Sequence, residues 1–129
     1  MTSPPTFATR RVVPILRMFS VEKAREFYLD WLGFKVDFEH RFDATAPLYM
    51  QVSRGELVLH LSEHYGDGSP GITIFVEVVG LAALHAEITA KGYRYLRPGI
   101  EHREWGASEM TLIDPFGNRL RLSEYDRRA

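Results

Sequence analysis

Five histidines and several carboxylates are the side chains of this sequence best suited to metal binding or catalysis, because the chain contains no cysteine. Without thiols it can form no disulfide, no thiolate nucleophile and no cysteine-bound zinc site. His60 and His64 are four residues apart, a spacing that brings side chains together on a helix but not on a strand that runs into a loop. A metal site built from His40, His60 and His64 stays open as an alternative, although no recognised spacing supports it.

Other catalytic arrangements receive less support from the sequence. Ser62 and Ser123 fall near strand ends without the elbow motif of a serine nucleophile. The glycines of YGDGSPG, residues 65–71, are not followed by the lysine of a phosphate-binding loop. Glu109 can act as a general base if it faces His60 across a cavity. Pairing of this carboxylate with an arginine at a sheet edge is the favoured interpretation.

Hydrophobic periodicity predicts one helix and several strands in each half of the chain. Ser20 is suited to begin a helix that ends at Gly33, and a second helix over residues 81–91 ends at Gly92. Both glycines are expected to have a positive φ. The expected strands cover residues 12–18, 34–42, 48–53, 57–62, 72–79, 93–97, 109–113 and 119–124.

The two halves repeat the same order of elements. The segments KAREFYLDWLGFKV (residues 23–36) and AALHAEITAKGYRY (residues 82–95) both read as a helix, a glycine and an aromatic residue that opens a strand. The sequence therefore predicts two tandem βαβββ modules, residues 8–63 and 71–125, joined by a linker at 64–70. Neither module can bury its sheet alone. The expected fold is α+β, a curved mixed eight-stranded sheet with helices outside and a cup inside.

Length and charge restrict the function classes. The 129 residues suit one domain, and a formal charge of -1 argues against a nucleic-acid binder, which needs a basic surplus. No apolar run approaches the roughly 20 residues of a membrane helix. Residues 1–10 contain two prolines and no apolar core of a signal peptide. We expect a cytoplasmic protein with a small-molecule ligand and no nucleic-acid or membrane partner.

Two motifs resemble the vicinal oxygen chelate superfamily, also called the glyoxalase, bleomycin-resistance and dioxygenase group. They are EFYLDWLGFKV, residues 26–36, and WGASEMTLIDPFGNRLRLSE, residues 105–124. The spacing of WG and DPFGN is most similar to the bleomycin-resistance-like branch. The resemblance implies a duplicated fold with a cup-shaped site and a homodimer. Bleomycin-sequestering members are strongly acidic, so the near-neutral charge of this chain leaves the identity of the ligand open.

Members with enzymatic activity hold a divalent ion with histidine or carboxamide and carboxylate side chains on four strands. By the resemblance, those positions fall on Val13, His60, Thr73 (or Ile72 with a shift of one residue) and Arg121. One donor in four does not make a metal site, and the permanent cation of Arg121 repels a metal. The sequence thus predicts no metal and no other cofactor. Arg121 is suited to an anionic or carbonyl-bearing ligand.

Aromatic side chains outside the helix-packing pattern are the candidates for the wall of the cup. The predicted ligand-binding residues are Phe38, Phe42, Tyr49, His60, Phe75, Trp105, Glu109 and Arg121. An aromatic wall favours planar ligands, since ring stacking adds about 0.5–1.5 kcal/mol per pair. We expect a metal-independent protein that sequesters a planar drug or metabolite, as antibiotic-resistance proteins do. The alternative is a metal-dependent lyase, isomerase or dioxygenase with a displaced ligand set.

Overall fold

The computed structural model describes residues 6–126 and contains eight strands and two helical segments. The helical segments are α1 (Val21–Ala24), continued by the wider π-helical turns η1 (Arg25–Trp31), and α2 (Leu81–Lys91). The strands are β1 (Ile15–Arg17), β2 (Lys35–His40), β3 (Tyr49–Arg54), β4 (Leu57–Ser62), β5 (Thr73–Glu77), β6 (Glu101–Arg103), β7 (Ala107–Ile113) and β8 (Arg119–Tyr125).

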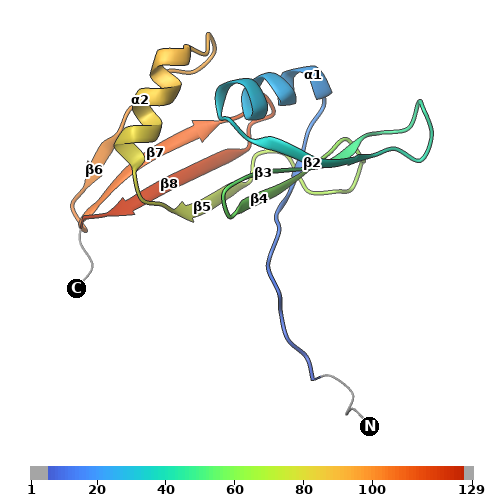
Figure 1. The fold of residues 1–129 in the computed structure, drawn as a ribbon, viewed down its shortest axis with the longest axis horizontal. Helices are drawn as coiled ribbons and strands as arrows, with labels where there is room; N and C mark the ends of the chain where they lie inside the picture. Colours follow the sequence, from blue (N-terminus) through green and yellow to red (C-terminus); the bar gives the residue numbers. More distant parts are fainter. Residues whose placement is uncertain (1–5, 127–129) are drawn as a thin grey trace.

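The strands form two four-stranded mixed sheets with the same topology. The orders are β1-β4-β3-β2 and β5-β8-β7-β6, and in each sheet the first strand pairs in parallel with the fourth. Both helical segments lie on one side of the sheets (Figure 1). This confirms the two tandem βαβββ modules. The eight strands are divided between two sheets, one from each module, where one continuous sheet was expected.

The expected strands 34–42, 72–79 and 109–113 differ from β2, β5 and β7 by one or two residues at their ends, and two other strands differ more. The first strand is limited to Ile15–Arg17, because only these residues pair with β4. No strand forms over residues 93–97, and the edge strand β6 starts only at Glu101. Pro98 explains the second difference, since it lacks an N–H donor and restricts the backbone of the residue before it.

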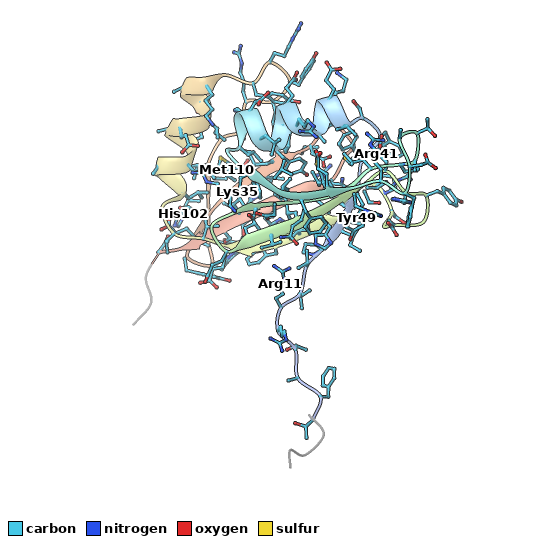
Figure 2. All side chains as sticks on the ribbon, turned by 45° about the vertical axis from the view of Figure 1, so that its right-hand side comes forward. Arg11, Lys35, Arg41, Tyr49, His102 and Met110 are labelled. Carbon is cyan, nitrogen blue, oxygen red and sulfur yellow. The ribbon has the colours of Figure 1, made fainter. Side chains whose placement is uncertain are left out.

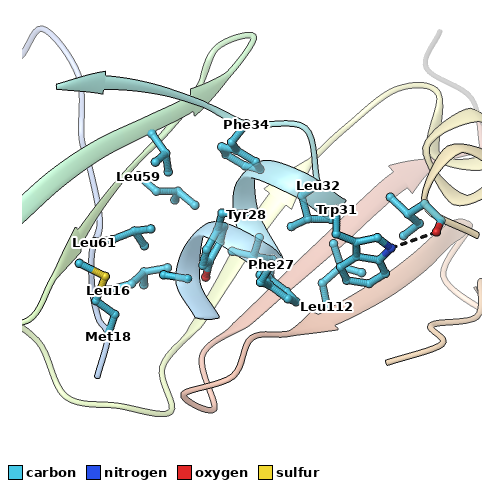
Figure 3. Close-up of a cluster of buried hydrophobic side chains, with 14 of the residues drawn as sticks. Leu16, Met18, Phe27, Tyr28, Trp31, Leu32, Phe34, Leu59, Leu61 and Leu112 are labelled. Carbon is cyan, nitrogen blue, oxygen red and sulfur yellow. Dashed lines mark hydrogen bonds between the residues drawn. The ribbon is translucent and has the colours of Figure 1, made fainter. Parts of the chain in front are cut away.

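The first helical segment begins at Ser20, whose side chain accepts a hydrogen bond from the backbone N–H of Lys23, as predicted. It buries Phe27, Tyr28 and Trp31 against leucines of both sheets (Figure 3). The indole N–H of Trp31 donates to the backbone carbonyl of Ile88 in α2 at 2.9 Å. One aromatic helix face therefore joins the two modules into a shared core.

Gly33 and Gly92 follow the two helical segments with φ of 74° and 70°. These values confirm the predicted ends, because a left-handed residue terminates a helix at little cost only when it lacks a Cβ.

A buried carboxylate in the turn before β8 connects the modules by hydrogen bonds. Oδ2 of Asp114 accepts from the hydroxyl of Tyr28 at 2.6 Å and from the amide of Asn118 at 2.9 Å. The same amide donates to the backbone carbonyl of Arg17 in β1, and its oxygen accepts from the N–H of Gly71. Burial raises the pKa of Asp114, while these donors act in the opposite direction.

Among residues 6–126, no helix is both long and apolar enough to cross a membrane.

We expect Tyr28→Phe to lower the free energy of unfolding by about 1–3 kcal/mol, because it removes one donor from a buried carboxylate. Urea denaturation measures the change. Tyr65→Phe is the matched control, since Tyr65 is almost fully exposed and its substitution should have an effect within about 0.5 kcal/mol. Equal stability of the two variants would show that the hydrogen bond from Tyr28 to Asp114 does not stabilise the fold.

Candidate ligand-binding site

Six of the eight predicted site residues lie on strands, on the sheet faces turned away from the helices. The other two, Phe42 and Trp105, lie in connecting segments. In β4, Leu59 and Leu61 are fully buried in the core, while His60 points to the opposite face. In β8, Arg121 lies between two leucines of the core, so strand alternation places Arg121 on the opposite face as well. We call these surfaces the open faces of the first sheet (β1–β4) and of the second sheet (β5–β8).

A β-bulge in the edge strand β2 turns Phe38 onto the open face of the first sheet. Val36 pairs with Val52 and packs against the core, but after the bulge Phe38 pairs with Gln51 on the open face. The extra residue, Asp37, accepts a hydrogen bond from the side chain of Gln51 at 3.0 Å. A regular strand would have kept Val36 and Phe38 on one face.

Six aromatic rings follow one another, four of them on strands of this open face and two in the connecting segments that follow β2 and β4. The ring of Phe38 lies 5.8 Å from that of His60, and His60 lies 5.1 Å from Tyr49. Beyond Tyr49 the contacts continue through His64 to Phe42, at 6.4 and 6.0 Å, and from Phe42 to His40 at 5.0 Å. We name this set the aromatic face: Phe38, His40, Phe42, Tyr49, His60 and His64.

Sequence reasoning included four of these six residues and missed His40 and His64. The alternation of His40 with Phe38 and Phe42 indicates a shared face, but the sequence offered His40 and His64 only as possible metal ligands with His60. His64 lies in the connection after β4, where no periodicity predicts a direction.

A chain of hydrogen bonds holds the centre of the aromatic face. The hydroxyl of Tyr49 lies 2.5 Å from Nδ1 of His60, and Nε2 of His60 lies 2.9 Å from Oε1 of Gln51. Arg11, which lies below the first sheet on the side opposite the helices (Figure 2), donates to the same oxygen of Gln51 at 3.3 Å. Both ring nitrogens of His60 therefore have hydrogen-bond partners.

Burial, hydrogen bonds and nearby charges determine the protonation of His60 and Asp37. Burial, and then the positive charge of Arg11, lower the pKa of His60 below its ordinary value, so the imidazole is neutral at pH 7. Hydrogen bonds from Lys35, Gln51 and a serine lower the pKa of Asp37 to about 2, so it stays ionised.

The open face of the second sheet carries the other predicted residues. Phe75 is half exposed and pairs with Arg121 across the β5–β8 ladder. Trp105 is 63% exposed in the turn before β7, and the guanidinium of Arg103 lies 5.9 Å from its ring. This exposure leaves the indole accessible to a ligand.

Glu109 is paired with an arginine, as the sequence interpretation favoured. Its side chain is only 5% exposed, and Nε of Arg103 donates to it at 3.2 Å. Arg103 also forms an ion pair with Glu101 at 3.0 Å. Glu109 thus lies on the second sheet, whereas His60 bonds to Tyr49 and Gln51 on the first sheet. The structure therefore does not pair Glu109 with His60 as a general base.

A groove of about 760 Å³ opens elsewhere, on the helix side between the two modules. Its walls are apolar, and the ion pair of Arg54 with Glu87 lies at its rim. None of the eight predicted site residues lines it. The lining side chains include Leu32, Phe34, Leu57, Val76, Leu84 and Leu120.

The residues beside His60 and Arg121 do not suit a metal ion. In register with His60 lie Ile15 and Gln51, and in register with Arg121 lie Phe75 and Thr111. Within residues 6–126 there is no group of three or more histidine or carboxylate side chains that could hold a metal. The donor set thus does not fit the divalent ion that the family resemblance implies for enzymatic members.

We expect Arg11→Ala to raise the pKa of His60, because it removes a positive charge that disfavours protonation of the imidazole. An NMR titration of the histidine ring signals measures the pKa. Arg10→Ala is the control, since Arg10 is the neighbouring exposed arginine and, after burial, the charge that lowers the pKa of His60 is that of Arg11. An unchanged pKa of His60 in Arg11→Ala would mean that Arg11 does not lie over Gln51.

Comparison with known proteins supports the same assignment. A sequence profile described as a glyoxalase superfamily protein matches residues 5–128. Among curated proteins, no match was found. A bleomycin resistance determinant encoded on transposon Tn5 superimposes with a TM-score of 0.71 at 26% identity, covering 92% of this chain and 100% of the other.

Two further solved structures show the same fold. The bleomycin-binding protein of Streptomyces verticillus, complexed with copper(II)-bleomycin, has a TM-score of 0.65 and 27% identity over 91% of this chain and 97% of its own. A glyoxalase-related enzyme from Clostridium phytofermentans has a TM-score of 0.70 and 21% identity over 92% and 97%. This chain therefore belongs to the glyoxalase superfamily, and the structures similar to it include bleomycin resistance and bleomycin-binding proteins.

Proposed function

We propose that this protein is a metal-independent binder that sequesters a planar or aromatic drug or metabolite in the cytoplasm and so protects against it. The observation that carries the proposal is the aromatic face, six rings in succession on the open side of the first sheet. Edge-on and tilted rings of this kind leave ring surfaces that suit a flat heterocycle better than a flexible polar substrate. The similar structures with bound bleomycin or a bleomycin-resistance role support a drug as ligand.

The side chains available as donors support binding without a metal. His60 uses both ring nitrogens in hydrogen bonds to Tyr49 and Gln51. Arg121 places a permanent positive charge where an enzymatic relative needs a ligand, and repulsion of a divalent ion at 4 Å is about 8 kcal/mol at an effective dielectric of 20.

We further propose that the protein is a homodimer. Each of its two ligand-binding cups is lined by the open face of one module 8–63 and that of one module 71–125, which residues 64–70 join within a chain. The two sheets leave β1, β2, β5 and β6 as edges, and exposed edges favour pairing. Residues 6–10 run away from the body as an extended segment (Figure 1), in which Phe7 is 92% exposed, and Val12, next to Arg11, is 88% exposed. Apolar side chains on such an arm are suited to burial against a second copy.

Sedimentation equilibrium should give about twice the 14.8 kDa of one chain over a wide concentration range. A mass of one chain at every concentration would contradict the homodimer.

Metal analysis of protein purified without chelators should find no stoichiometric transition metal, because the donors are too few and a cation stands among them. A near-stoichiometric metal that is lost in His60→Ala would instead favour the metal-dependent lyase, isomerase or dioxygenase.

Trp105→Ala should weaken the binding of bleomycin, used as the probe, about two- to tenfold, because one stacking surface is lost. Calorimetry measures the affinity. Tryptophan fluorescence adds a second readout, since Trp31 is buried and quenching reports mainly on Trp105. Tyr95→Ala, which removes an exposed ring outside the proposed site, is the control. Equal affinities of Trp105→Ala and the wild type would exclude Trp105 from the site.

A further inference from the structure

The side chains at one end of the hydrogen-bond chain fix the orientation of the Gln51 amide. Arg11 can only donate, and its guanidinium lies 3.3 Å from one end of the amide. Asp37, whose pKa is about 2, can only accept, and it lies 3.0 Å from the other end. The amide oxygen must therefore point to Arg11 and the amide nitrogen to Asp37, because the reverse orientation would break both bonds.

This orientation determines which nitrogen of His60 carries the proton. Nε2 of His60 faces the oxygen of Gln51 at 2.9 Å, so Nε2 must donate. The ring is neutral at pH 7, because burial lowers its pKa, and Nδ1 is therefore without a hydrogen. Nδ1 must accept the proton of the Tyr49 hydroxyl, which lies 2.5 Å away.

The consequence appears at the other end of the hydrogen-bond chain, at the half-buried Tyr49. With its hydrogen committed to His60, the oxygen of Tyr49 presents only lone pairs to a ligand. The negative charge of Asp67 acts on the same hydroxyl and also favours a positive or donating group there. A ligand with a carbonyl or ether oxygen at this point could be satisfied only by breaking the bond to His60, which would leave Nδ1 unpaired.

We propose that Tyr49 determines specificity at the aromatic face by selecting ligands that present a hydrogen-bond donor, such as a ring N–H, while Gln51, Asp37 and Arg11 are positioning residues. This inference rests on the proposed function and narrows its ligand class. Arg121, on the other sheet, requires the opposite chemistry, an acceptor or an anion. At the aromatic face the ligand is thus a planar ring system with a donor on the edge that faces Tyr49.

Indole and benzofuran test the donor directly, because the two bicyclic rings have nearly the same shape and differ in an N–H donor against an oxygen. NMR titrations at pH 7 should show that the wild type binds indole about fivefold more tightly than benzofuran, the size expected for one hydrogen bond. Tyr49→Phe should reduce this preference to less than twofold. Tyr65→Phe, which changes an exposed tyrosine outside the face, should keep it.

Each outcome separates the inference from the function on which it rests. Equal binding of indole and benzofuran, or a preference for benzofuran, would overturn the role of Tyr49 and leave a planar-ligand site standing. Binding of neither probe would contradict the proposed function itself.

The proton order can be read without any ligand. The ¹⁵N shifts of the His60 ring should show a hydrogen on Nε2 and none on Nδ1. Gln51→Leu should allow the other tautomer to appear and should weaken the preference for indole, whereas a purely structural Gln51 would change stability and leave the tautomer as it is. A wild-type ring with its hydrogen on Nδ1 would overturn the proposal whatever the titrations show.

Discussion

The buried carboxylate of Asp114 is the constraint on which the arrangement of this molecule depends. The two modules build separate sheets, and side chains rather than a continuous ladder join them. Asp114 accepts from Tyr28 of the first module, and Asn118 passes the connection on to the backbone of Arg17. A carboxylate without donors in this position would cost several kcal/mol. The DPFGN turn thus fixes how the two open faces stand to one another.

Hydrogen bonds among half-buried polar side chains also order the candidate site. On the first sheet, a bulge supplies Asp37 and turns Phe38 outward in a single step. The hydrogen-bond chain then orders the rings of Tyr49 and His60, so that they meet a ligand already oriented. Preorganised side chains lose little further entropy on binding. The second sheet offers a contrasting surface, in which Arg121 stands beside an exposed Phe75.

Periodicity and glycines predicted most of the fold, because they report directly on local geometry. The helix ends at Gly33 and Gly92 and the module order needed no tertiary information. The bulge at residues 36–38 could not be predicted in the same way, since alternation placed Val36 and Phe38 on one face and pairing with β3 separated them. The division into two sheets and the groove between the modules depend on packing among distant residues, which no local pattern records.

The central claim is that the ligand lies on the open, aromatic face and not in the apolar groove on the helix side. An NMR titration with indole distinguishes the two locations, with selective labels on the aromatic rings and on the leucine and valine methyl groups. The account predicts that the ring signals of Phe38, Tyr49 and His60 shift with a common affinity while the methyl groups of Leu57 and Val76 do not. Shifts confined to the methyl groups of the groove would contradict it.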